Sequence, residues 1–190
     1  MIHVNTESSQ FTNLLCHFDR DLAERCRAQG CPDCGQRLHL ACYPRKPHGL
    51  APLTNLEDWC FRWSYCCARC RARTTPASLR FLGRRIYVGA VVVLTACMQQ
   101  GLSERRVAAL NLMLEVPRRT LQRWRLWWQQ VFVHSAFWRL ARARLMPPVN
   151  EQGLPLSLFE RFVGTELEEQ LTHLLNFISP LSTRARAHAV

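Results

Sequence analysis

The sequence predicts a mainly α-helical chain that is interrupted by one small β module. Apolar residues recur at spacings of three and four through residues 7–29 and again from Phe81 onward, which is the period of amphipathic helices. Residues 31–75 lack this period and are punctuated by Gly, Pro and Cys, as expected for short strands and turns. Because 48% of the 190 residues are hydrophobic and no low-complexity tract occurs, we expect a folded protein.

Composition divides the chain into four predicted segments. The N-terminal helix should end at Gly30, because glycine commonly terminates helices. The β module follows, then a basic helical part, and Pro147 and Pro148 mark the start of a more acidic helical tail. The predicted segments are residues 1–30, 31–78, 79–146 and 147–190.

The basic part is predicted to contain three helices and the tail two. Gly101 should close the first helix, Ser103 is a good N-cap for the second, and Pro117 suits the first turn of the third. Aromatic residues from Trp124 to Trp138 follow helical spacing, so we expect them to form core rather than a stacking platform for single-stranded nucleic acid. The five expected helices span residues 84–100, 103–114, 117–134, 156–163 and 165–177.

Cysteine content predicts the cellular compartment. The chain has ten cysteines and shows no amino-terminal signal peptide. Its longest uncharged apolar run covers 13 residues, which falls short of the roughly 20 that cross a bilayer. In reducing compartments, clustered thiolates bind metal more often than they form disulfides. We therefore expect a cytoplasmic protein with no membrane segment and with a metal-binding cysteine cluster.

Two Cys-x-x-Cys pairs have the spacing of zinc knuckles. Each such turn places two sulfur atoms on one edge of the zinc tetrahedron, and two turns complete it. Cys31 and Cys34 are followed by Gly35, which permits the positive φ of a tight knuckle. Cys67 and Cys70 form the second pair, and the residues between the pairs have room for a hairpin. The fold class that follows is mainly α with a small β zinc ribbon.

The ligand set leaves alternatives open. Cys66 is adjacent to Cys67 and could replace it as the partner of Cys70, and His39 with Cys42 could replace one ligand. A catalytic zinc keeps an open coordination position beside three protein ligands, and no His, Asp or Glu has the spacing for such a site. We therefore expect structural Zn²⁺ and no enzymatic activity.

Positive charge is concentrated in one part of the chain. Residues 59–149 contain 16 arginines and only two acidic residues, Glu104 and Glu115. Of the 25 basic residues, 24 are arginine, which suits planar contacts to phosphate or guanine, although a GC-rich genome would produce the same bias. This distribution predicts a nucleic-acid partner.

The predicted helices at 103–114 and 117–134 have the shape of a helix-turn-helix. In this motif the second helix lies in the major groove and flanking arginines contact phosphates. From Ser103 to Val116 the chain is longer than in the commonest form of the motif and the turn lacks its usual glycine, so a helical hairpin with a solvated arginine face is the alternative; the scarcity of acids favours DNA binding. The predicted contact residues are Arg71, Arg73, Arg84, Arg85, Arg105, Arg106, Arg118, Arg119, Thr120, Gln122, Arg123 and Arg125.

Three motifs resemble the N-terminal DNA-binding part of bacterial insertion-sequence transposases. They are CPxCG at Cys31, Arg-x-Arg-Thr-Thr-Pro at 71–76 and Arg-Thr-Leu-x-Arg-Trp at 119–124. Residues 75–87 also resemble uncharacterised bacterial proteins associated with mobile elements. The resemblance covers about residues 30–130 and implies a zinc ribbon followed by a helix-turn-helix. No Asp follows Trp59, so the carboxylates of a transposase catalytic domain are missing and the resemblance implies an accessory or regulatory protein.

The function that the sequence favours is sequence-specific binding of double-stranded DNA in the cytoplasm, in association with the nucleoid. One alternative is a module that binds RNA or single-stranded nucleic acid. Another is a structural subunit of a nucleoprotein assembly, which would bind a partner such as a transposase or recombinase through the tail. The apolar residues of that tail are Leu156, Phe159, Phe162, Leu167, Leu171, Leu174 and Leu175.

Overall fold

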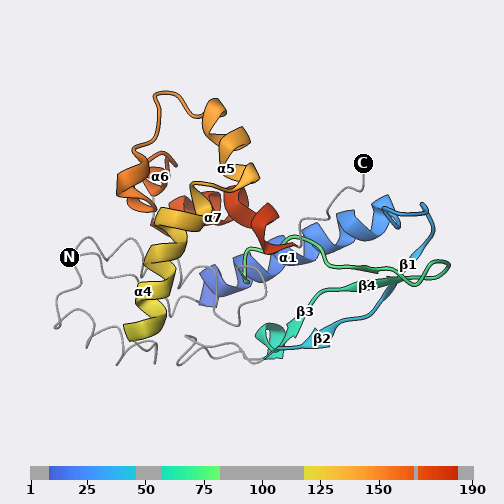
Figure 1. Ribbon diagram of the computed structural model, residues 1–190. Coiled ribbons are helices and arrows are strands. Elements are labelled where there is room, and N and C mark those ends of the chain that lie inside the picture. The colour runs from blue at the N-terminus through green and yellow to red at the C-terminus, as the bar shows by residue number, and fades with distance from the viewer. Residues whose placement is uncertain (1–8, 46–56, 82–117, 165–166, 184–190) are drawn as a thin grey trace. The chain divides into compact units, whose positions relative to one another are not determined.

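The computed structural model describes residues 9–45, 57–81, 118–164 and 167–183 (Figure 1). Within these residues, helices and small antiparallel sheets make a mixed α/β protein with a small β region. The chain forms two compact units. Unit 1 comprises residues 1–47, 52–87 and 176–190, and unit 2 comprises residues 48–51 and 88–175.

This division differs from the four predicted segments. The N-terminal helix and the β module share unit 1, and the predicted tail is divided between the units after Leu175. Composition could not show this, because the last part of the chain joins unit 1 through contacts with residues about 100 positions earlier, such as the hydrogen bond from the Ser78 amide to Ser182 Oγ.

Helix α1 (Ser9–Gln29) forms where the sequence predicts it. It ends at Gly30, whose φ of 77° favours glycine, and a Cβ at this position would lie 2.8 Å from the Gly35 carbonyl oxygen. Leu15 and Ala23 are buried on one side of the helix. The buried side is less apolar than the sequence period indicates, because it also contains the carboxylate of Asp19.

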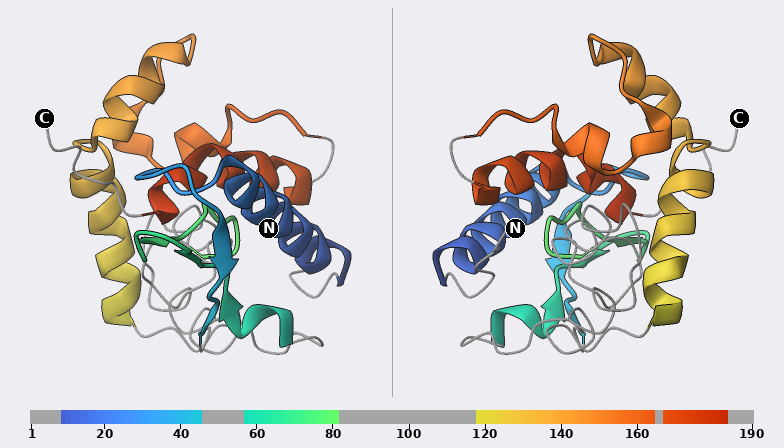
Figure 2. Two further views of the ribbon diagram at one scale, coloured as in Figure 1. Left: turned by 90° about the vertical axis from the view of Figure 1, so that its right-hand side faces the viewer. Right: turned by 90° about the vertical axis from the view of Figure 1, so that its left-hand side faces the viewer.

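The β region consists of two small antiparallel sheets in unit 1. Strand β4 (Tyr65–Cys67) pairs with both β1 (Leu38–Leu40) and β5 (Arg73–Thr74), so β4 is the central strand. Strands β2 (Tyr43–Pro44) and β3 (Phe61–Arg62) form the second sheet, and the 3₁₀ turn η1 (Glu57–Trp59) precedes β3 (Figure 2).

The sheet packs on the end of α1 through a small core. This core contains Ala23 of α1, Leu38 of β1, and Tyr65 and Cys67 of β4, together with Cys31. The Tyr65 hydroxyl donates a buried hydrogen bond of 2.9 Å to the carbonyl oxygen of Ala23. The core therefore lies directly beside the cysteines that the sequence predicts to bind metal.

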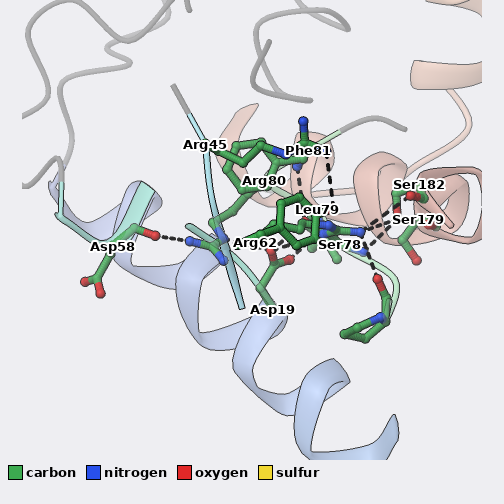
Figure 3. A network of polar contacts seen from close by, with 12 residues as sticks. Asp19, Arg45, Asp58, Arg62, Ser78, Leu79, Arg80, Phe81, Ser179 and Ser182 are labelled. Atoms are coloured by element: carbon green, nitrogen blue, oxygen red, sulfur yellow. Dashed lines mark hydrogen bonds and ion pairs between the residues drawn. The ribbon is translucent and has the colours of Figure 1, made fainter. Parts of the chain in front are cut away.

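A buried polar network holds together segments of unit 1 that are distant in sequence (Figure 3). The Asp19 carboxylate accepts hydrogen bonds from the Ser78 hydroxyl, the Leu79 amide at 2.6 Å and Arg80 Nε at 2.7 Å. Arg62 Nη1 lies 4.0 Å from the same carboxylate. Both arginines and Asp19 are almost completely buried, so one carboxylate balances two guanidinium groups.

Arg62 links this network to the C-terminal part of the chain. Its Nη2 donates to the carbonyl oxygen of Pro76 at 2.8 Å and lies 3.5 Å from both the carbonyl oxygen and Oγ of Ser182. Burial lowers the pKa of Arg62 from its ordinary value, and the nearby Asp19 carboxylate counteracts this effect. Aromatic rings also surround the network, with the Arg80 guanidinium 5.4 Å from the ring of Phe61.

The described part of unit 2 is helical. Helix α4 (Arg118–Leu126) continues into a π-helical turn, η2 (Trp127–Phe132), and is followed by α5 (Ala136–Ala141). The remaining elements are the 3₁₀ turns η3 (Arg142–Arg144) and η4 (Glu151–Gly153), helix α6 (Leu156–Phe159), helix α7 (Leu167–Ile178) and the 3₁₀ turn η5 (Ser179–Ser182). The last three residues of α7 and all of η5 belong to unit 1.

Aromatic residues form the core of unit 2, as predicted. Trp124, Trp128, Phe132 and Trp138 are all buried, and the rings of Phe132 and Trp138 have centroids 5.0 Å apart. Trp138 Nε1 donates a hydrogen bond of 2.8 Å to Glu151 Oε1. The predicted helices at 84–100 and 103–114 lie outside the described residues, so the first helix of the predicted helix-turn-helix does too. Among the helices described, none combines the length and apolar character needed to span a bilayer.

Candidate metal centre and nucleic-acid interface

Four cysteine sulfurs of unit 1 converge on one point. The Sγ atoms of Cys31, Cys34, Cys67 and Cys70 all lie within 4.8 Å of one another. The Cys31–Cys70 pair is separated by 3.5 Å and the Cys34–Cys67 pair by 3.4 Å, so no disulfide joins them. Tetrahedral zinc with Zn–S bonds of about 2.3 Å requires sulfurs about 3.8 Å apart. The cluster can therefore hold a zinc ion with small side-chain adjustments.

Both knuckles have similar backbone geometry. In the first, the Gly35 amide donates to the Cys31 carbonyl oxygen at 2.7 Å and Gly35 has a φ of 71°. In the second, the residue after the last cysteine also has a positive φ, but it is Arg71, with a φ of 59°. The left-handed conformation is unfavourable for residues other than glycine. The second knuckle therefore contains a strained arginine where the first uses glycine.

Hydrogen bonds separate the acidities of the clustered thiols. Burial opposes ionisation of Cys67, but bonds from backbone amides, including that of Cys70, and from the Cys34 thiol lower its pKa to about 6. The Ala72 amide favours the Cys70 thiolate, but hydrogen bonds with neighbouring thiols and burial outweigh this effect and raise the pKa of Cys70 to about 12. Several thiolates this close repel one another, and a divalent cation would remove that repulsion.

Within the described residues, the cluster comprises the four cysteines named from the sequence and none of the alternates. Cys66 Sγ lies 3.5 Å from the carbonyl oxygen of Arg71, and neither His39 nor Cys42 joins the group. Strand geometry explains the choice between Cys66 and Cys67. Adjacent residues of β4 point to opposite faces, and Cys67 pairs with the buried Leu38.

Helix α4 presents a basic surface in unit 2. Arg119, Gln122, Arg123 and Arg125 are exposed, as expected for contact residues. Thr120 differs from the prediction, because it is buried and its hydroxyl accepts a hydrogen bond of 3.1 Å from Arg123 Nη2. It lies on the side of α4 that also buries Trp124, so it is unsuited to a contact surface. No acidic residue occurs between residues 118 and 150.

The predicted contact arginines outside α4 lie partly beside the second knuckle and partly outside the described residues. Arg71 and Arg73 are exposed beside the second knuckle. Two further arginines in this region, Arg37 and Arg69, are also exposed and were not among the predicted contacts, because the pairing of β1 with β4 that brings Arg37 to this knuckle is not visible in the sequence. Four predicted contacts, Arg84, Arg85, Arg105 and Arg106, lie outside the described residues, as does the Arg118 side chain.

Four of the seven apolar tail residues predicted to bind a partner protein are buried. Phe159, Leu171, Leu174 and Leu175 are buried. Helical periodicity identifies an apolar face without showing what covers it. Within the described part of the tail, these side chains belong to the protein's own core.

Comparison with known protein families, with characterised proteins and with solved structures finds no match for this chain. The assignment of a function therefore depends on the cysteine cluster and on the placement of the exposed arginines.

Proposed function

We propose that this chain is a double-stranded DNA-binding protein in which structural zinc holds the residues between the two knuckles. The observation that carries the proposal is the exposed basic side of α4, where Arg119, Gln122, Arg123 and Arg125 lie in a stretch without acidic residues. A helix that is only solvated usually interleaves acidic with basic residues. An uncompensated arginine surface is instead typical of phosphate contacts.

Zinc has a structural role in this proposal. All four ligands come from the protein, which leaves no coordination position for a substrate. The strands of unit 1 are two or three residues long, so their backbone pairing contributes little stability without the metal. We expect zinc to stabilise this unit and to affect DNA binding indirectly.

Burial of the aromatic residues argues against the alternative of single-strand binding. Base stacking requires exposed aromatic rings, whereas Trp124, Trp128 and Trp138 are buried. The association with a mobile element, as an accessory or regulatory protein, is part of the same proposal and depends on the motif resemblance.

Zinc binding is tested by elemental analysis of purified protein and two neighbouring serine variants. The wild-type chain and Cys66→Ser should each contain one zinc per chain, because Cys66 lies outside the cluster. Cys67→Ser should contain much less zinc and should unfold at lower temperature. Equal zinc content in both variants would contradict the assigned ligands.

DNA binding is tested by fluorescence anisotropy with labelled duplexes from the chain's genomic neighbourhood. Affinity should fall steeply with salt, and log K should change by about 0.9 per phosphate contact for each unit of log salt concentration. Arg119→Gln should weaken binding and lower this slope. Arg25→Gln, at an exposed position of α1 with Asp21 and Glu24 nearby in sequence, is the matched control and should bind as wild type. Salt-independent affinity of the wild type would refute the proposal.

A further inference from the structure

The second knuckle and the adjacent strands bring together arginines that are distant in sequence. The amide of Ala68, in the knuckle, donates a hydrogen bond of 3.1 Å to the Arg37 carbonyl oxygen, which places Arg37 beside this turn. Arg69 and Arg71 belong to the turn itself, and Arg73 follows in β5. All four arginines are exposed.

Strand register places another basic residue on the outer face of the sheet. His39 of β1 pairs with Cys66 of β4, which pairs in turn with Arg73 of β5. Side chains directly opposite one another lie on the same face. The next pair, Leu38 with Cys67, is buried. The row of His39, Cys66 and Arg73 therefore faces away from the core.

The strands and the second knuckle contain no carboxylate, and the first knuckle contributes Asp33. No acidic residue occurs at positions 34–56 or 59–103, so none of the five strands contains one. Within the described part of the chain, no ion pair involves the four exposed arginines. Their positive charge is therefore directed to solvent.

Arg71 provides an independent observation. Its φ of 59° costs roughly 1 kcal/mol or more relative to glycine, and glycine occupies the equivalent position of the first knuckle. Residues held in strained backbone conformations cluster at functional sites. At this position the side chain supplies an exposed guanidinium beside three others.

We propose that Arg37, Arg69, Arg71 and Arg73, with His39, form a second DNA contact surface that binds the phosphate backbone of a duplex. This inference rests on the proposed function and extends it from α4 to the zinc-bound module. Arginine binds phosphate through paired N–H donors. The outward row of the sheet contains no Phe, Tyr or Trp on which an unpaired base could stack, which favours a duplex over a single strand.

In this proposal the zinc ion also orders the second DNA contact surface. The knuckle that carries Arg69 and Arg71 contributes Cys67 and Cys70 to the cluster. A metal that fixes both cysteines would fix the positions of the neighbouring guanidiniums. Ordering these side chains before binding reduces the conformational entropy that is lost when the protein binds DNA.

Arg71→Gly is the most informative test, because its expected effects on stability and binding have opposite signs. Glycine adopts a φ of 59° without strain, so thermal unfolding should occur at the same or a higher temperature. Duplex affinity in the anisotropy assay should fall about ten-fold, and the salt slope should decrease by about 0.9, as for one lost phosphate contact.

Arg73→Gln is the second variant, since it leaves the knuckle untouched, and it should show the same loss of affinity and slope. Arg25→Gln should match the wild type. If Arg119→Gln weakens binding while Arg71→Gly and Arg73→Gln bind as wild type, the second surface is refuted and the proposed function stands. If the wild type shows no salt-dependent affinity, both fail. Equal competition by single-stranded RNA would overturn the assignment to a duplex.

Discussion

Replacing Asp19 by asparagine should strongly destabilise unit 1. The substitution preserves the shape of the side chain but removes the one negative charge that lies between Arg62 and Arg80. The remaining amide oxygen can accept from only one of Arg80 and the Leu79 amide, and both buried guanidiniums would lose the carboxylate that lies within 4.0 Å of each. Removing one partner of a buried ion pair costs about 3 to 5 kcal/mol, whereas whole domains are stable by only about 5 to 15 kcal/mol.

Hydrogen–deuterium exchange with mass spectrometry can assign this loss to the correct unit. A destabilisation of about 3 kcal/mol should speed exchange by more than about 100-fold in peptides covering β3 and β4, if exchange follows opening of unit 1. Peptides from α5 report on unit 2. The control is Asp21→Asn on the exposed side of the same helix, two residues further along. Similar exchange in both variants would refute the idea that Asp19 compensates the buried arginines.

Two further substitutions test individual polar side chains. Bonds from Trp138 and Arg142 lower the pKa of Glu151, so their contribution is present above its unfolded pKa, about 4.3, and is lost as pH falls through the folded value. Lowering the pH below about 4 should therefore speed hydrogen exchange in α5 by more than the intrinsic exchange rate changes, and Glu151→Gln should remove this additional acceleration. An unchanged pH profile in the variant would contradict this role of Glu151. Tyr65→Phe removes the 2.9 Å bond to the Ala23 carbonyl, which keeps its partner within α1, and should destabilise unit 1 by about 0.5 to 1.5 kcal/mol in a denaturant titration, whereas wild-type stability would show that this bond contributes nothing.

Local patterns in the sequence were enough to locate the cysteine cluster. The spacing of Cys31 and Cys34 and the glycine that follows them specify a tight turn through backbone geometry alone. The end of α1 at Gly30 was predictable for the same reason, whereas α5 (Ala136–Ala141) was not among the predicted helices. Aromatic residues at helical spacing also identified the core of unit 2, including Trp124 and Trp128.

Contacts between distant segments were not predictable in this way. The period of α1 places Asp19 among apolar residues but does not show that Arg62 and Arg80 would reach it from residues more than 40 positions later. Likewise, the apolar face around Leu171 and Leu174 was visible in the sequence, but only packing shows that it is buried.

The cysteine cluster combines features that the sequence determined with features that only the tertiary structure decided. The sequence alone determined that two knuckles occur and that their chemistry suits zinc, because ligand type and spacing are local properties. It left Cys66 and Cys67 as competing ligands. Tertiary structure decided between them, since pairing of β4 with β1 directs Cys67 toward the core and Cys66 away from it. The same pairing brings Arg37 to the second knuckle, because strand register joins residues that no sequence period connects.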